Sequence, residues 1–103
     1  MSRGPDAGAR LERGLLASAA GAGCVVTIVD ATWVRWASAT FVGARHTLWL
    51  QAVAGATLDR WLADVPEAEI ALRDHLLADL VITAVTRTDG VARITIEALT
   101  LEA

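Results

Sequence analysis

Two histidines and one cysteine are the residues of this 103-residue chain best suited to acid–base, nucleophilic or metal chemistry. Cys24 opens a run of β-branched residues, where a cysteine usually behaves as a small apolar side chain rather than as a nucleophile. No serine stands in the glycine-flanked sequence that exposes a nucleophilic hydroxyl on a sharp turn. We therefore predict no catalytic nucleophile.

A metal site would have to draw on His46, His75 and nearby acids such as Asp74 and Asp79. If residues 67–79 form a helix, His75 and Asp79 lie four residues apart on one face and could supply two ligands. Two ligands do not complete a site, and no glycine-rich loop follows a strand to hold a phosphate. We therefore expect neither a metal nor another cofactor.

Asp30 interrupts an apolar stretch and has two possible roles. It is either a turn residue at the end of a strand, which we favour, or a partly buried acid. The other acid pairs, such as Glu67 and Glu69, are typical of a solvated surface.

Tryptophan supplies the most informative pattern, because three of the four indoles fall in one predicted hairpin, close to two arginines. Alternation places Trp49 on the polar side of its strand, where an apolar ring needs a cover. We predict that a ligand or interface surface includes Trp33, Arg35, Trp36, Arg45 and Trp49. It would act as a protein contact or as a platform for a flat ligand or unpaired bases. The alternative is that a helix covers this face and Trp49 is a core residue.

The charge balance restricts the partners. Nine arginines and no lysine oppose twelve acids, giving a formal net charge of −3. Such a chain lacks the basic surface of a duplex-binding domain, so we exclude duplex nucleic acid. The uncharged stretch at 14–29 is too short and too rich in alanine and glycine to span a membrane. One cysteine cannot form an internal disulfide, which excludes a disulfide-stapled secreted fold. Asp6 and Glu12 lie where a signal peptide would be purely basic, so we expect a cytoplasmic protein.

The first half of the chain predicts a helix followed by a hairpin. Asp6 is a suitable N-cap for a helix over residues 6–20, which Gly21 and Gly23 would end. Residues 24–29 read as a strand, and 32–42 continue either as a second strand after a break or as one long bent strand. A tight turn at 42–44 then leads to a strand over 45–53.

The second half predicts another helix and another hairpin. Thr57 is expected to cap a short helix, and Pro66 is expected to end or restart that helix. One side of the helix forms a buried apolar stripe, which comprises Leu58, Trp61, Leu62 and Val65. Apolar residues four apart favour a helix over 67–79, while an edge strand at 69–72 and a turn at 73–74 is the alternative. Strands at 80–87 and 91–101 flank Asp89-Gly90, which suits a type I′ turn.

These elements predict one α+β domain over residues 1–103, with two to three helices and an antiparallel sheet of four to five strands in αββαββ-like order. Because 54% of the residues are hydrophobic, we expect more apolar surface than two layers can bury, and hence a homodimer.

The function predicted is a noncatalytic interaction or small-ligand-binding module that uses a Trp-rich sheet surface. Besides a second copy of the chain, this surface could bind an apolar small molecule or a partner protein. The alternative is a small cofactor-independent enzyme that pairs a histidine with an acid in a dimer cleft; the candidates are His46, His75, Asp30, Asp74 and Asp79. An enzyme would need a histidine within hydrogen-bond reach of a carboxylate at a pocket mouth.

Overall fold

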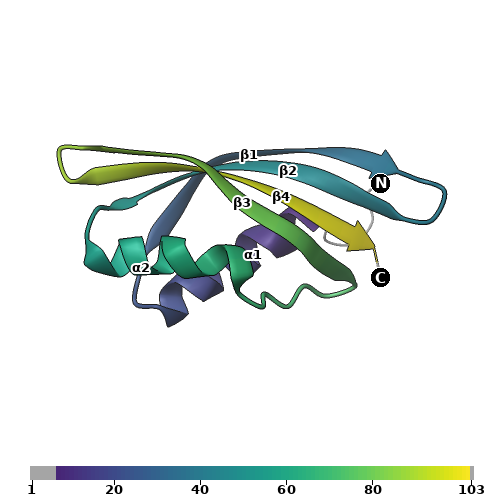
Figure 1. Ribbon diagram of the computed structural model, residues 1–103, viewed down its shortest axis with the longest axis horizontal. Helices are drawn as coiled ribbons and strands as arrows, with labels where there is room; N and C mark the ends of the chain where they lie inside the picture. Colours follow the sequence, from purple (N-terminus) through teal and green to yellow (C-terminus); the bar gives the residue numbers. More distant parts are fainter. Residues whose placement is uncertain (1–6, 103) are drawn as a thin grey trace.

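The computed structural model describes residues 7–102 as two helices on one face of a four-stranded antiparallel sheet (Figure 1). The elements are α1 (Ala7–Gly21), β1 (Val26–Ala37), β2 (Val42–Val53), α2 (Ala56–Asp64), the 3-10 turn η1 (Val65–Glu67), β3 (His75–Thr88) and β4 (Val91–Glu102). The predicted α+β class and the αββαββ order are confirmed.

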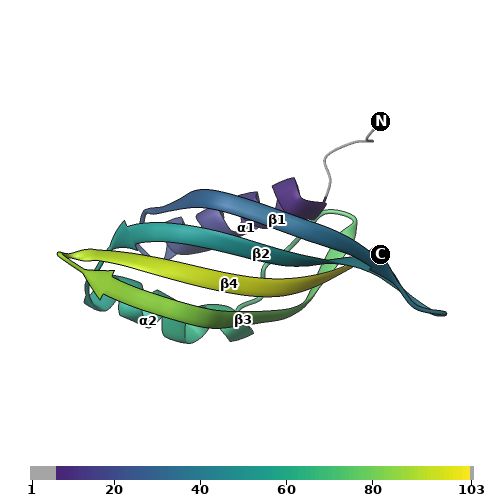
Figure 2. The same ribbon diagram turned by 90° about the horizontal axis from the view of Figure 1, so that it is seen from above.

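The strands lie in the order β1-β2-β4-β3, so each helix–hairpin unit supplies one edge strand and one central strand. Figure 2 shows the four strands side by side with both helices behind them, α1 on the β1 side and α2 on the β3 side. The two units therefore join through the pairing of β2 with β4.

The core fills the space between the sheet and the helices. β2 alternates as predicted, with His46, Leu48, Leu50 and Ala52 buried and the residues between them turned to the other face. The Trp61 indole N–H also donates a hydrogen bond of 3.1 Å to the Ser18 hydroxyl, which links α2 to α1. The buried apolar residues from the other elements include Leu11, Leu15, Leu58, Leu62, Val65, Leu80, Ile94 and Ile96.

The predicted glycine stop of α1 is confirmed. Gly23 has a φ of 86°, in the left-handed region, and the Cys24 N–H donates to the carbonyl of Ala19 at 2.8 Å. The Gly23 N–H donates to the carbonyl of Ala20 at 3.0 Å, which completes a Schellman cap. The proposed Asp6 cap lies outside the described residues.

β1 is one long bent strand rather than two strands separated by a break, as the second interpretation of residues 24–42 predicted. The bend is a β-bulge between Ile28 and Asp30, where the register with β2 shifts by one residue. The favoured role of Asp30 at a strand end is wrong, because the acid lies within the strand. It is also exposed, and its carboxylate accepts the Ala31 N–H at 2.8 Å.

The turn predicted at 42–44 is also wrong, because the chain reverses at residues 38–41. The Ser38 hydroxyl accepts the N–H groups of Phe41 at 3.0 Å and Thr40 at 3.3 Å, so a serine closes this turn. Gly43 instead lies within β2, where a Cβ atom would overlap the carbonyl oxygen of Thr100 on β4. The glycine therefore permits close strand approach rather than a turn.

Two predictions for α2 have opposite outcomes. Its buried stripe is confirmed, with the first three residues in the helix and Val65 just beyond it, in η1. The Thr57 cap is wrong, because the helix begins at Ala56 with Gly55 as N-cap and no side-chain cap.

The helix predicted over 67–79 is wrong as well. Residues 68–71 are irregular, Leu72 forms a single bridge to His75, and β3 starts there. Ile70 and Leu72 pack against α1 beside Gly14, where a Cβ atom would lie 2.7 Å from Ile70 Cγ2 and 3.3 Å from Leu72 Cδ2. The turn at 73–74, which belonged to the alternative interpretation, is present, with Asp74 at a φ of 62°.

The second hairpin agrees with its sequence. Asp89 and Gly90 have φ values of 54° and 79°, as a type I′ turn requires. Along β4, Ile94 and Ile96 are buried, whereas Arg93 and Glu97 are exposed on the opposite face, as predicted.

Candidate interaction surfaces

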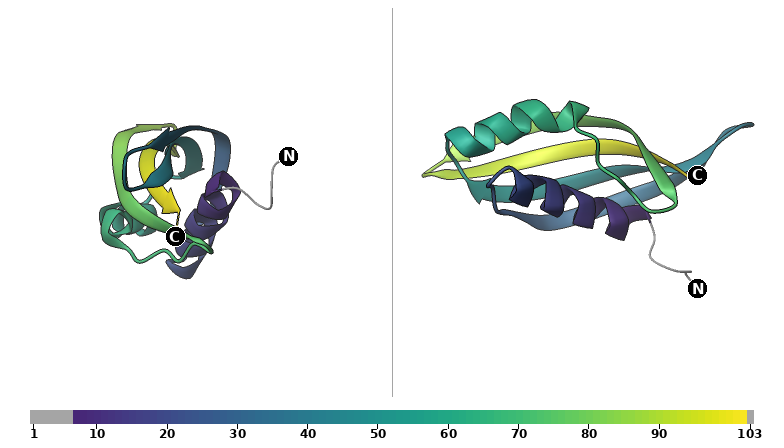
Figure 3. Two further views of the ribbon diagram at one scale, coloured as in Figure 1. Left: turned by 90° about the vertical axis from the view of Figure 1, so that its right-hand side faces the viewer. Right: turned by 90° about the horizontal axis from the view of Figure 1, so that it is seen from below.

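One face of the sheet carries no helix among residues 7–102. The end-on view in Figure 3 shows both helices on the same side of the curved sheet. We call the other side the open face. Because residues paired across antiparallel strands share a face, the register assigns to its central rows Thr27, Asp30, Thr32, Val34, Trp36, Arg45, Thr47, Trp49, Gln51, Asp79, Val81, Ala84, Thr86, Arg93, Thr95, Glu97 and Leu99.

Trp49 lies in an inner row of the open face. It stands opposite Asp30 on β1 and Thr95 on β4, and its side chain is still 38% exposed. Trp49 therefore belongs to an uncovered surface, and the alternative that it is a core residue beneath a helix is wrong.

Apolar and charged side chains are mixed across the open face. Val34 and Val81 on the two edge strands are 69% and 46% exposed. The charged residues include both signs: Arg45, Arg93, Asp30, Asp79 and Glu97. This face is neither the uniformly polar surface of a typical monomer nor a continuous apolar patch.

Trp36 lies at the hairpin end of the open face, opposite Gly43. It is half-buried, and its indole Nε1 is buried without a hydrogen-bond partner in the described chain. A glycine opposite an aromatic residue leaves room for the ring to cover the neighbouring strand.

The five predicted site residues divide between the two faces. Trp36, Arg45 and Trp49 lie on the open face, whereas Trp33 and Arg35 lie on the helix side, opposite His46 and Ala44. Arg35 forms an exposed ion pair of 3.7 Å with Glu102. Side chains alternate between the two faces along a strand. Because Trp33 and Trp36 are an odd number of residues apart in β1, this alternation predicts that they project from opposite faces of the sheet.

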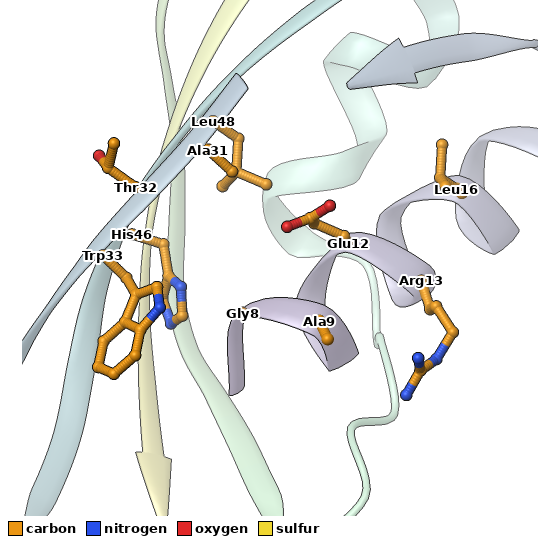
Figure 4. Close-up of a pocket in the computed structure, with 10 residues that line it drawn as sticks. All are labelled: Gly8, Ala9, Glu12, Arg13, Leu16, Ala31, Thr32, Trp33, His46 and Leu48. Carbon is orange, nitrogen blue, oxygen red and sulfur yellow. The ribbon is translucent and has the colours of Figure 1, made fainter. Parts of the chain in front are cut away.

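Trp33 lines a groove between α1 and β1 that sequence reasoning missed. The α1–β1 groove has a volume of about 410 Å³ and is lined from α1 by Gly8, Ala9, Glu12, Arg13 and Leu16, and from the sheet by Ala31, Thr32, Trp33, His46 and Leu48. Figure 4 shows Trp33 and His46 next to each other on the sheet wall, with Glu12 turned toward the sheet from the helix. The small residues Gly8, Ala9 and Ala31 in the lining are a sequence signal for this groove.

His46 forms part of the buried floor of the groove. The side chain is 3% exposed, and its Nε2 lies 2.8 Å from the hydroxyl of Thr100, which is fully buried. A hydrogen bond between two buried polar side chains holds the imidazole in one orientation.

Among residues 7–102, no hydrogen bond joins His46 or His75 to the candidate acids Asp30, Asp74 and Asp79. His75 Nδ1 lies 3.0 Å from the main-chain carbonyl of Arg73, and the candidate acids Asp30, Asp74 and Asp79 are all exposed. β3 is a strand, so His75 and Asp79 do not share a helical face. Within residues 7–102, no group of three or more His, Cys, Asp or Glu residues could hold a metal ion.

In the same part of the chain, no helix is both long and apolar enough to cross a membrane. Cys24 is buried in the connection between α1 and β1 and is not in a disulfide.

No family model matches the sequence, and no curated protein is significantly similar to it. The fold resembles a chain of the structure "Virion of native gene transfer agent (GTA) particle", with a TM-score of 0.51 and 18% sequence identity. The alignment covers all of this chain and 75% of that chain. At this level of identity the likeness concerns the fold alone.

Proposed function

We propose that this chain is a noncatalytic assembly module of the cytoplasm, and that it binds a second copy of itself through the open face. The observation that carries the proposal is the half-exposed Trp49 within a sheet face that no described element covers. Indole side chains in the interior of an interface are among the strongest contributors to binding.

The charges of the open face favour a second copy as the occupant. Arg45 and Arg93 project from the central strands, while Asp30 and Asp79 project from the two edges. When the face packs against itself, cations of each copy can meet carboxylates of the other, so no uniform charge opposes association. Such a self-complementary contact has two-fold symmetry.

The size of the face is consistent with a reversible dimer. Four strands about 4.8 Å apart and about ten residues long cover roughly 600 Å² in each copy. Two copies would bury about 1,200 Å², which is the lower end of the range for specific interfaces. We therefore expect a dissociation constant in the micromolar range.

The similar fold supports the same class of function. The neighbour is a chain of a gene transfer agent virion particle. An assembly role also agrees with a chain whose open face presents tryptophan, valine and mixed charges rather than a catalytic group.

The test measures the dimer directly and perturbs the indole. We expect sedimentation equilibrium to show a monomer–dimer equilibrium between low-micromolar and several-hundred-micromolar concentrations. Trp49→Thr removes the ring but keeps a strand-forming residue, and should weaken dimerisation at least about 30-fold, as for an interface hot spot. The melting temperature of the diluted monomer should hardly change, because Trp49 is not in the core.

Phe41→Thr provides the matched control. Phe41 is 51% exposed at the tip of the β1–β2 hairpin, outside the open face, and its replacement should leave the equilibrium unchanged. A chain that stays monomeric throughout, or a dimer that Trp49→Thr weakens no more than Phe41→Thr does, would contradict the proposal.

A further inference from the structure

We propose that the α1–β1 groove is a binding site for a guanidinium group, independent of the open face. The groove lies on the helix side of the sheet, so it remains accessible whether or not the open faces are paired. The inference rests on an indole and a carboxylate that line the same hollow (Figure 4).

Glu12 supplies the negative charge. It is half-buried on α1, its side chain is turned toward the sheet, and it forms no ion pair with any described residue. A carboxylate that has lost part of its hydration gains most from a cation that also donates hydrogen bonds.

Trp33 supplies the aromatic surface. Its side chain is 47% exposed although it lies on the helix side, because β1 is an edge strand and the groove separates it from α1. Cations bind to the face of an indole more strongly than to other aromatic rings.

The shape of the groove favours a planar cation. Gly8, Ala9 and Ala31 contribute only small side chains to the lining, and the volume of about 410 Å³ is within the range of small-ligand sites. A guanidinium can combine stacking on an indole face with in-plane N–H donation to a carboxylate, which the compact ammonium of a lysine cannot do.

Arg13 lines the groove but does not neutralise Glu12. In Figure 4 its guanidinium points away from Glu12, and the side chain is exposed. Adjacent helix residues project about 100° apart, which keeps the two charges separate.

The experiment titrates the full chain with arginine amide, a guanidinium probe without a carboxylate, and follows the indole N–H signals by heteronuclear NMR. We expect saturable shifts of the Trp33 signal with a millimolar dissociation constant, and none with citrulline amide, the neutral isostere. Glu12→Gln should weaken binding about tenfold, as for one charge-assisted contact, and Trp33→Leu should weaken it similarly. Glu69→Gln, at an exposed position outside the groove, is the matched control and should not alter the affinity.

A second arm distinguishes a small molecule from a protein as the source of the guanidinium. A capped pentapeptide with a central arginine flanked by glycine and alanine should bind more tightly than arginine amide if the natural ligand is a segment of a protein. Equal affinities indicate a free small molecule. The proposal is overturned if citrulline amide shifts the signal equally, if no shift occurs, or if Glu12→Gln, folded by its NMR spectrum, binds as the parent does.

Discussion

Gly43 occupies a position where β2 approaches the main chain of β4. A methyl group there would overlap the carbonyl oxygen of Thr100, which is main chain and cannot turn aside. We expect Gly43→Ala to lower the free energy of unfolding by about 1–3 kcal/mol, the usual cost of overpacking. Thermal unfolding would show a melting temperature lower by roughly 4–8 °C for each kcal/mol.

Gly21→Ala is the matched control for this substitution. Gly21 is the last residue of α1, and no atom lies within 4 Å of an added Cβ. The same change should be neutral or slightly stabilising there. Equal destabilisation by the two substitutions would show that the close approach of the strands does not determine the role of Gly43.

The exposure of individual side chains could be predicted where alternation is regular. Along β2 and β4, a period of two assigned Trp49 and Arg93 to one face and Leu48 and Ile94 to the other. The groove residue Glu12 could not be found in this way. Its role depends on which strand edge α1 packs beside, and this is a tertiary property.

The β1–β2 hairpin depends on a turn closed by a serine rather than by a glycine. The Ser38 hydroxyl accepts two main-chain N–H groups of residues 40 and 41. We expect Ser38→Ala to lower the free energy of unfolding by about 1 kcal/mol, measured by urea denaturation. Ser38→Asp keeps an acceptor at the same position and should retain most of the stability, whereas a loss equal to that of alanine would rule out the capping role.

Elements with two competing signals were the ones predicted wrongly. Gly43 suggested a turn because glycine is common in turns, while the serine that closes the real one has a weaker signal. In residues 67–79, leucines four residues apart favoured a helix. The segment instead remains irregular, since Ile70 and Leu72 pack on α1 beside Gly14 and Asp74 then turns the chain into β3.

By contrast, Asp89-Gly90 combines turn chemistry with strands of clear alternation on both sides, and both signals agree.

The whole molecule combines two helix–hairpin units with one shared sheet and one shared core. β2 and β4 turn alternate residues to the helix side of the sheet, where these join residues of both helices in one buried cluster. One consequence is a single layer of helices and a sheet with two different faces. The order of elements was predictable from sequence, whereas the meeting of the two units at β2 and β4 was not.

Hydrogen exchange over the whole chain can distinguish association through the open face from addition of a strand at an edge. The central strands β2 and β4 have partners on both sides, so their amides should exchange slowest, at rates governed by global unfolding. In β1, every second N–H points away from β2 and should exchange rapidly.

Pairing of open faces involves side chains only, so the N–H groups of β1 that point away from β2 should exchange equally fast below and above the dimerisation concentration. Strand addition at β1 would instead slow alternate amides of the segment from Asp30 to Ala37 as the concentration rises. That result would move the interface from the face of the sheet to its edge.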